Sequence, residues 1–475
     1  MRRAHWHPVE RRQSRPRVSG ASRGPGSGAS RGPAPEVEVV VVGAGAAGLG
    51  AGAALFAAGR SVVVLDASAQ AGGMMRSERI DGFLIEHGPN TTRIPAGALT
   101  LLQNAGLEPA LLKASPESRE RFLLRPSGLV PVPLSPLGFA RTPLLSRAGK
   151  WRMLCEPFVR GRDGAGESVA AFVERRLGGE VVDALLGPFL VGVYAGDERQ
   201  LGAEAVFPAL VSAEREGGSI VLGLLRRTLA GGPRGLPGTW SAREGLGGLA
   251  ALLARGLGPS LRLGTRARAL VPEAKGWRVE LEDGALRAAK LVLATDAAGA
   301  ADLLGKLDAD AAELLRALPF APIVSVALAL DADATARAPS GFGFLVPRDL
   351  GLDLLGALFM SRLFVRRAPG GSELVTALLG GLRWPGALDA PDDTLLARVN
   401  EGLDRALGLR RAPRALAITR WARAVPQPGP GHPSAVRAIR ERLRRFPPIA
   451  LAGACWDGVA LGEALASGAR AAGAL

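Results

Sequence analysis

The sequence has few of the side chains that enzymes use as nucleophiles, metal ligands or proton carriers. Its 475 residues include two cysteines, four histidines and one tyrosine. Cys155 and Cys455 lie 300 positions apart, which fits neither a disulfide framework nor a metal site and favours a reducing compartment. Two histidines fall within the first seven residues, so only His87 and His432 remain for a metal site or a Ser–His–Asp triad. We therefore predict no metal ion and expect a bound cofactor to supply the chemistry.

Acidic residues are nearly absent from residues 1–35, where eight arginines stand against a single acid, Glu10. This segment accounts for nearly half of the net charge of +15, so no nucleic-acid partner is predicted for the less basic body of the chain. The segment is dense in Ser, Gly and Pro, and we predict a disordered basic tail over 1–35. Its composition is similar to that of a transit peptide, but an amphipathic pattern is missing, so an extended start or a solvated tail stays open.

No charged or polar side chain interrupts residues 39–59, a run of 21 residues that is long enough to cross a bilayer. Its composition argues against a membrane span. The run divides into four valines (39–42), a glycine turn and an alanine-rich segment with helical spacing. Residues 61–65 follow as a second strand, and Asp66 stands at its end. We predict a buried strand, turn and helix that open a dinucleotide-binding unit.

The turn has the spacing of a GxGxxG phosphate-binding loop. Gly43 is expected to allow the tight turn, Gly45 to let the backbone approach a pyrophosphate, and Gly48 to let the helix pack closely on the strand. The free N–H groups and the dipole at the start of the helix favour a bound anion. Asp66 lies 23 residues after Gly43, close to the position of the acidic residue that hydrogen-bonds a cofactor ribose. The glycine pair at 72–73 predicts a second close approach to the same cofactor.

The rest of the pattern predicts an α/β protein whose nucleotide-binding unit is interrupted twice. Residues 116–235 show apolar side chains at helical spacing with charges between them. Residues 244–300 return to α/β, and the chain ends in a predicted strand (449–453) and helix (460–472). These signals divide the chain after the tail into a nucleotide-binding domain (36–90, 241–300 and 415–475), a substrate-binding domain (91–115 and 301–414) and a helical region (116–240).

A series of motifs resembles one family, the FAD-dependent protoporphyrinogen oxidases within the wider flavin amine oxidase group. In chain order the motifs are GAGAAGLG, GGMMRS, ESVAAFVERRLG, PFLVGVYAGD, FPALVSAEREGGSIVLG, GFGFLVPR, LLGALFMSRLFVRRAP, VTALLGG, WARAVPQPGPGH and LAGACWDGVALGEALASG. The resemblance covers about residues 36–475. It implies an interrupted Rossmann-like FAD-binding domain of the amine oxidase and glutathione reductase type, a mixed-sheet substrate domain and an inserted helical region that associates with a membrane.

The resemblance implies an FAD site. The glycine turn would cradle the pyrophosphate, and Asp66 would hold the adenosine ribose, although most members have Glu at this position. Ala267 would contact the adenine side, and the start of the last helix would approach the isoalloxazine ring. The cofactor-binding residues expected on this basis are Gly43, Ala44, Gly45, Ala46, Ala47, Gly48, Asp66, Gly72, Gly73, Met74, Arg76, Gly88, Pro89, Asn90, Thr91, Ala267, Ala454, Val459, Ala460 and Leu461.

The resemblance also implies a substrate site. Arg121 matches the family arginine that pairs with a porphyrinogen propionate, and a guanidinium suits this role because it meets a carboxylate through two parallel hydrogen bonds. The expected substrate-binding residues are Arg121, Gly192, Phe342, Gly343, Leu345, Leu358 and Leu378. No side chain is assigned as a catalytic acid or base. Tyr194 is expected at a packed helix end, and Cys455 is expected to be a small buried thiol rather than a covalent flavin link.

The implied activity is the oxidation of protoporphyrinogen IX to protoporphyrin IX, in which six electrons leave the substrate and three O2 are reduced to H2O2. A coproporphyrinogen III oxidase is the nearest alternative, and extra basic residues in the pocket would favour it. Flavin amine oxidases, desaturases and non-catalytic carriers such as Rab GDP-dissociation inhibitors are more remote. The implied location is cytoplasmic, at the inner face of the cytoplasmic membrane with peripheral attachment. A homodimer is left open.

Overall fold

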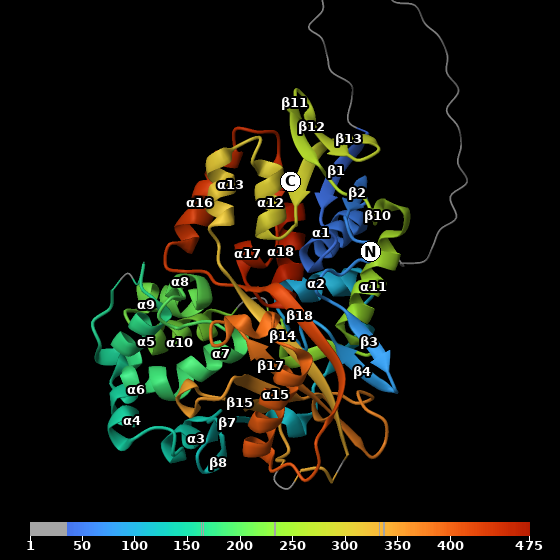
Figure 1. Ribbon diagram of the computed structural model, residues 1–475. Helices are drawn as coiled ribbons and strands as arrows, with labels where there is room; N and C mark the ends of the chain where they lie inside the picture. The colour runs from blue at the N-terminus through green and yellow to red at the C-terminus, as the bar shows by residue number, and fades with distance from the viewer. Residues whose placement is uncertain (1–35, 163, 165, 232–233, 332, 336–337) are drawn as a thin grey trace, which may run out of the picture.

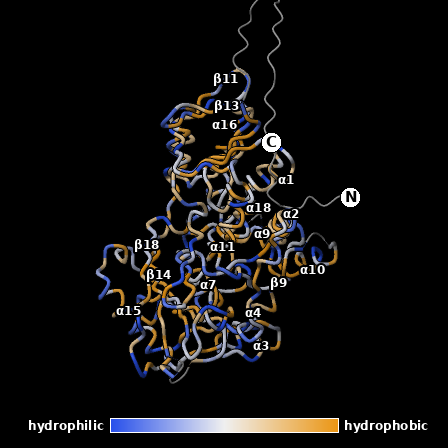
Figure 2. Tube along the Cα trace, turned by 90° about the vertical axis from the view of Figure 1, so that its right-hand side faces the viewer, coloured by the Kyte–Doolittle hydropathy of each residue, from blue (hydrophilic) through white to orange (hydrophobic). Residues whose placement is uncertain are grey.

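The protein has two lobes, each built on a seven-stranded sheet, and a group of helices beside the second sheet (Figure 1). The predicted tail lies outside the residues that are described. A view turned by 90° shows the same two lobes, with β11 (Ala269–Glu273) at the end of one and α15 (Asp392–Leu407) in the other (Figure 2). The computed structural model describes residues 36–475 apart from 163, 165, 232–233, 332 and 336–337.

The first sheet is mainly parallel. Its order is β10-β2-β1-β13-β12-β11, and β19 pairs with β13. The pairs β10–β2, β2–β1, β1–β13 and β13–β19 are parallel. The pairs β13–β12 and β12–β11 are antiparallel. The remaining bounds are β1 (Val37–Val42), β2 (Val62–Leu65), β10 (Leu261–Arg262), β12 (Gly276–Leu281), β13 (Gly284–Leu293) and β19 (Ile449–Leu451).

Both faces of β1 are buried, which explains its unbroken run of valines. Val39 and Val41 pack against α1, α2, α11 and α18, whereas Val40 and Val42 face α12, α13 and α16. A parallel strand covered by helices on both sides is hydrophobic throughout rather than alternating. The predicted strand, turn and helix are therefore confirmed. The helices are α1 (Ala46–Ala57), α2 (Ala96–Asn104), α11 (Gly245–Leu257), α12 (Ala297–Leu304), α13 (Ala309–Arg316), α16 (His432–Leu443), α17 (Ala454–Asp457) and α18 (Leu461–Gly473).

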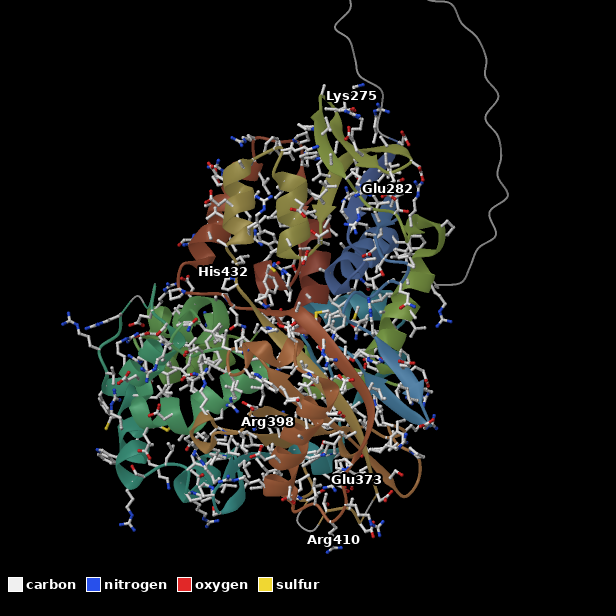
Figure 3. The ribbon with its side chains drawn as sticks, in the orientation of Figure 1. Lys275, Glu282, Glu373, Arg398, Arg410 and His432 are labelled. Carbon is white, nitrogen blue, oxygen red and sulfur yellow. The ribbon has the colours of Figure 1, made fainter. Side chains whose placement is uncertain are left out.

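The second sheet is mixed, with the order β18-β14-β17-β16-β15-β7-β8. All its pairs are antiparallel except β15 with β7. One face packs on α15 around Val324, Val375 and Leu403. Figure 3 places Arg398 on α15, and Arg410 at the opposite end of the molecule from Lys275. The strands are β7 (Arg121–Arg125), β8 (Gly128–Pro131), β14 (Phe320–Asp331), β15 (Gly343–Leu345), β16 (Leu354–Phe359), β17 (Ser372–Gly380) and β18 (Arg414–Pro426).

Two small sheets lie where the lobes meet. β3 (Ser77–Ile80) and β4 (Phe83–Glu86) form a hairpin. β5 (Thr92–Ile94) and β6 (Leu111–Lys113) both pair with β9 (Leu236–Ala242). The short helix α14 (Met360–Leu363) follows β16.

The helical region has its own hydrophobic core around Phe172, Leu190 and Val211. Ser135, Ser146, Ser168 and Ser219 cap its helices by accepting a backbone N–H bond, which satisfies a donor that the first turn leaves free. No helix among the described residues is long and apolar enough to cross a membrane. The helices are α3 (Pro136–Arg141), α4 (Arg147–Leu154), α5 (Val169–Leu177), α6 (Gly179–Val181), α7 (Gly187–Tyr194), α8 (Ala203–Val206), α9 (Pro208–Gly217) and α10 (Ile220–Ala230).

Two predicted boundaries differ from the strand pairing. The segment 116–240, predicted to be helical, begins with β7 and β8, which extend the second sheet, and ends in β9. Residues 415–426, predicted to lie in the nucleotide-binding domain, belong to β18, which pairs with β14 in the second sheet. The reason in both cases is long-range pairing, which hydrophobic periodicity does not encode. The division into domains otherwise stays a prediction.

Candidate functional site

The three motif glycines meet three different surroundings. Gly43 has φ of 106°, and a Cβ atom there would lie 2.6 Å from the carbonyl oxygen of Ala294 on the neighbouring strand. A Cβ on Gly48 would lie 1.7 Å from the oxygen of Gly43, so only glycine lets α1 pack this closely on the turn. A Cβ on Gly45 would meet no atom within 4 Å. Two glycines are therefore required by the protein itself, and the third faces open space.

Asp66 fixes the shape of the turn at the end of β2. Its Oδ2 accepts a hydrogen bond of 2.6 Å from the backbone N–H of Ala44, and its Oδ1 accepts one of 2.7 Å from that of Ser68. Each carboxylate oxygen has a second lone pair that can accept a bond from a ribose hydroxyl. The loop that contains Ala267 begins beside Asp66, because the N–H of Thr265 donates to the carbonyl of Asp66. The structure thus brings these two predicted residues to one strand end.

The glycine pair lies directly on the first turn. The N–H of Gly72 donates a 2.8 Å bond to the carbonyl of Ala44, and Gly72 forms an isolated bridge with Gly45. A Cβ on Gly73 would come within 3.3 Å of the Cα of Gly45. The glycine pair therefore lies beside the first turn, and its approach to the same cofactor stays a prediction. Ala46 and Ala47 continue from the turn into the first residues of α1.

Residues 88–91 pack against the segment that follows the glycine pair. A Cβ on Gly88 would lie 2.0 Å from the carbonyl oxygen of Met74, and the N–H of His87 donates to the carbonyl of Arg76. Pro89 and Thr91 are half-buried on either side of Asn90. Asn90 is buried, and its Oδ1 has no hydrogen-bond partner among the described residues. An unpaired buried amide oxygen is costly, so it indicates a position where a ligand donor is expected.

The C-terminal turn closes the same side of the site. Ala454 begins α17, Leu461 begins α18, and Val459 and Ala460 lie between these helices. Thr92 Oγ1 accepts a 3.0 Å bond from the N–H of Gly462, which ties β5 to the start of α18. The predicted flavin-facing residues from opposite ends of the chain therefore lie side by side.

The residues present fit an FAD cofactor. The open side of Gly45, the carboxylate of Asp66 and the unpaired Asn90 Oδ1 are a set suited to phosphates and hydroxyls. The hydroxyl of Thr295 is a further candidate that sequence analysis did not assign. This hydroxyl is buried two residues after the end of β13 and has no partner in the part of the chain that the structure describes, and the backbone N of Thr295 is 3.1 Å from the Cβ position of Gly43. Its only signal in the sequence was its place at a predicted strand end.

The predicted substrate residues share the face of the second sheet that is turned away from α15. Gly343 pairs with Arg121 on one side and with Leu358 on the other. The Arg121 guanidinium lies 4.5 Å from the centre of the Phe342 ring, a cation–π contact. A Cβ on Gly343 would lie 2.1 Å from the carbonyl oxygen of Ala357, so this glycine is required by strand packing.

Helix α7 covers the other end of this face. A Cβ on Gly192 would lie 2.5 Å from a Cδ atom of Leu345, so α7 and β15 are in close contact there. Leu378 packs against the small hydrophobic cluster that includes Val191 of the same helix. The structure therefore groups Arg121, Phe342, Gly343 and Leu358 at one place, and Gly192, Leu345 and Leu378 beside α7.

Arg121 is half-buried with no carboxylate partner among the described residues. Burial lowers its pKa, and the nearby positive charge of Arg93 lowers it further. The one hydrogen bond of its guanidinium within the described chain goes to the backbone oxygen of Arg119, at 3.3 Å. A half-buried cation without an acid is available for an anionic ligand.

Strand β18 joins the two groups of predicted residues. Trp421 Nε1 donates a 2.7 Å bond to the carbonyl of His87, and Thr419 Oγ1 lies 2.8 Å from Nδ1 of the same histidine. The Arg76 guanidinium stacks 5.5 Å above the Trp421 ring. Trp421 and Thr419 were not assigned from sequence, since nothing in the pattern placed residues 415–426 in the second sheet.

Tyr194 and Cys455 have reactive side chains, but both are buried. Burial raises the pKa of Tyr194 to about 12 at the end of α7, which confirms the predicted packed helix end. Burial also raises the pKa of the Cys455 thiol to about 12, so the predicted buried thiol stays protonated at neutral pH. Neither group suits proton transfer near pH 7.

Known proteins with the same features were identified by comparison. Residues 46–475 match the family of flavin containing amine oxidoreductases. The chain is 33% identical to human protoporphyrinogen oxidase over 478 residues, which covers 91% of this chain and 97% of that protein. This chain belongs to the flavin containing amine oxidoreductases, in the group of the protoporphyrinogen oxidases. It is also 30% identical to the chloroplastic protoporphyrinogen oxidase of Nicotiana tabacum, over 90% of this chain and 84% of that protein. The family is one of FAD-dependent oxidoreductases, so the protein is an FAD enzyme.

Solved structures agree with the fold of this flavoenzyme family. A candidate protoporphyrinogen oxidase from an Exiguobacterium species superimposes with a TM-score of 0.75 at 26% identity and covers 92% of this chain and 98% of that chain. Cyclohexylamine oxidase from Brevibacterium oxydans shares the fold, with a TM-score of 0.67 at 17% identity over 93% of this chain and 98% of that chain. The predicted two-domain amine oxidase architecture is confirmed.

Proposed function

We propose that the enzyme oxidises protoporphyrinogen IX to protoporphyrin IX in tetrapyrrole biosynthesis. The observation that carries the proposal is Arg121, a half-buried cation without an acid, set against the Phe342 ring on an apolar sheet face. A macrocycle with carboxylate arms is complementary to this arrangement, because the cation binds an arm and the apolar side chains contact the ring. Relatives that are named protoporphyrinogen oxidase support the same substrate.

The chain's residues have distinct roles in this proposal. When bound, FAD supplies the two-electron oxidation of a methylene bridge of the substrate. The glycine turn and Asp66 hold the pyrophosphate and ribose, and Asn90 and Thr295 pair with polar groups of the cofactor. Arg121 orients the macrocycle by one carboxylate. Positioning of this kind lowers a barrier by removing the entropy of encounter.

No side chain of this site is proposed as a strong base. Each two-electron step also releases one proton to solvent; of the three protons, two come from pyrrole nitrogens and one from the fourth methylene bridge, and aromatisation of the product supplies the driving force. Removing six electrons takes three oxidations of two electrons each, and O2 is the proposed acceptor, with three O2 reduced to three H2O2. The apolar walls formed by Leu345, Leu358 and Leu378 limit the access of water to the reacting ring.

An aerobic assay with two substrates tests the function. Purified enzyme is mixed with protoporphyrinogen IX or coproporphyrinogen III, and porphyrin fluorescence and H2O2 are followed. We expect faster oxidation of the two-propionate substrate and three H2O2 per porphyrin. Faster oxidation of coproporphyrinogen III would favour the alternative activity, and rates equal to the blank with both substrates, in protein that contains flavin, would refute the proposal.

Arg121→Ala tests the proposed substrate contact within this function. The variant should raise KM strongly while flavin content stays unchanged, because Arg121 lies outside the glycine turn. An unchanged KM would show that Arg121 does not bind substrate.

We further propose that the helical region attaches peripherally to the inner face of the cytoplasmic membrane. Among the described residues, most large hydrophobic side chains that are exposed lie between 134 and 229, including Trp151 and Leu154 (both 70%), Phe158 (89%) and Leu229 (79%). An exposed apolar surface of this kind fits a bilayer interface. A carbonate wash should release the protein from membranes, and retention in the pellet would contradict peripheral attachment. Light scattering of the purified protein decides whether a homodimer, which the sequence leaves open, forms.

A further inference from the structure

Arg93 is held on the edge of the site by two buried neighbours. It is the middle residue of β5, where Thr92 and Ile94 are buried and Arg93 is exposed. Thr92 binds the start of α18, and Ile94 packs in the core beneath the first sheet. Because side chains alternate across a strand, the Arg93 side chain points away from both anchors. Its direction is therefore fixed by the packing of residues on either side.

The backbone of Arg93 touches the turn that closes the flavin site. A Cβ built on Gly462 would lie 1.9 Å from the carbonyl oxygen of Arg93. Gly462 is the second residue of α18, directly after the predicted flavin-facing residues Ala460 and Leu461. Arg93 thus stands next to the proposed position of the isoalloxazine ring.

The sheet topology brings Arg93 toward Arg121. Thr92 of β5 and Lys113 of β6 both pair with Trp240 of β9. Seven residues (114–120), which include a 3₁₀ turn at Pro116–Arg119, lead from Lys113 into β7, which begins at Arg121. The charge of Arg93 is close enough to lower the pKa of Arg121. No ion pair or side-chain hydrogen bond of Arg93 is present among the described residues, whereas other exposed arginines such as Arg79 are paired with acids.

Two neighbouring cations without an acid repel each other, which destabilises the ligand-free protein. Charge repulsion that destabilises the fold is common at binding sites, because these sites are adapted to a ligand and not to stability. A ligand with two carboxylates would relieve the repulsion at both residues, whereas a ligand with one carboxylate would leave one cation unpaired.

We infer that Arg93 is a second carboxylate-binding residue, so that Arg93 and Arg121 together anchor two neighbouring carboxylate arms of the tetrapyrrole. The inference rests on the proposed function, whose substrate carries two propionates. A single anchor lets a flat ring swing about the contact point, whereas two anchors fix its rotation. Since Arg93 adjoins the start of α18, the second anchor sets which edge of the macrocycle meets the flavin.

Binding of the porphyrin product and its dimethyl ester tests the inference without turnover. The dissociation constants of protoporphyrin IX and its dimethyl ester are measured by fluorescence titration in one detergent, with the parent holoenzyme, Arg93→Ala, Arg121→Ala, the double variant and Arg255→Ala. Arg255 is the matched control, because it is an exposed arginine on α11 for which no ion pair is present in the described chain. We expect Arg93→Ala to weaken binding of the diacid by about 5- to 20-fold, the range of a partly exposed charge-assisted bond, and to leave ester binding unchanged.

A second readout separates binding from folding. Without ligand, Arg93→Ala should melt at the same or a higher temperature than the parent, because one repelling charge is gone. With the diacid, the parent should gain more thermal stability than the variant. Equal diacid affinity in Arg93→Ala and Arg255→Ala, with an intact effect of Arg121→Ala, would refute the inference and leave the proposed function standing. Absence of diacid binding by the parent would instead refute the proposed function.

Discussion

Replacing Gly45 with alanine should weaken cofactor binding and leave the fold intact. A Cβ atom at this position meets no protein atom within 4 Å, and Gly45 has φ of −72° and ψ of −170°, an extended conformation that alanine adopts freely. The added methyl would occupy the space through which the backbone approaches the FAD pyrophosphate. The free protein should therefore tolerate a change that the complex does not.

The expected loss of affinity follows from the cost of crowding a packed contact. Overpacking by one methyl costs about 1–3 kcal/mol, which corresponds to roughly 5- to 150-fold in the FAD dissociation constant. Flavin content is measured from the absorbance near 450 nm, affinity by titrating apoprotein with FAD, and folding by circular dichroism and thermal melting without cofactor. Apoprotein stability should stay within about 1 kcal/mol of the parent.

Substitutions of two other glycines serve as controls for this experiment. Gly370→Ala is the matched control, because its Cβ also meets nothing within 4 Å and the residue lies in an exposed loop. Gly48→Ala should fail to fold, since its Cβ would lie 1.7 Å from the oxygen of Gly43. If Gly45→Ala bound FAD as tightly as Gly370→Ala, the turn would not be the pyrophosphate site.

Three further substitutions test separate parts of the structure. Gly192→Ala should push Leu345 into the substrate face and raise KM while flavin content stays constant, and an unchanged KM would place the substrate elsewhere. Thr295→Val should weaken FAD binding by about 1 kcal/mol without destabilising the apoprotein, because the buried hydroxyl has no partner within the described chain; equal FAD affinity by titration would contradict its role. Arg442 lowers the pKa of Asp308, so the carboxylate stabilises the fold above the unfolded pKa of about 3.9, and this contribution is lost as the pH falls through the folded pKa. Asp308→Asn should therefore lower the melting temperature at pH 7 and lose this effect in acid, and a pH-independent difference would contradict the pairing.

The parts of the fold that sequence analysis predicted correctly are those in which local pattern and local structure coincide. The turn after β1 required glycine at 43 and 48 because backbone atoms meet there, and such a requirement is visible in sequence. The predicted strand at 449–453 and helix at 460–472 correspond to β19 and α18 within a few residues. Hydrophobic period and glycine spacing were sufficient for these elements.

The parts that were missed depend on partners far away in the chain. β18 lies in the second sheet because Ile418 faces Val326, more than ninety residues away, and no local pattern carries that pairing. Thr295 and Arg93 are unremarkable in sequence, and they become candidates only because folding leaves a hydroxyl and a guanidinium unpaired near the site. An unsatisfied group is a property of the assembled structure, so sequence analysis could not have identified these two residues.

The segment 87–93 connects both halves of the site and should couple them. The carbonyl of His87 accepts the bond from Trp421 of the second sheet, and the hydroxyl of Thr92 accepts the bond from the start of α18. Asn90, with its unpaired oxygen, lies between these two anchors, and Arg93 follows directly after them. A shift of residues 87–93 would move the predicted cofactor contacts at 88–91 and the proposed carboxylate-binding residue Arg93 together. Substitutions that loosen either anchor should therefore change flavin affinity and KM together, whereas Arg121 lies outside the segment and its loss affects KM alone.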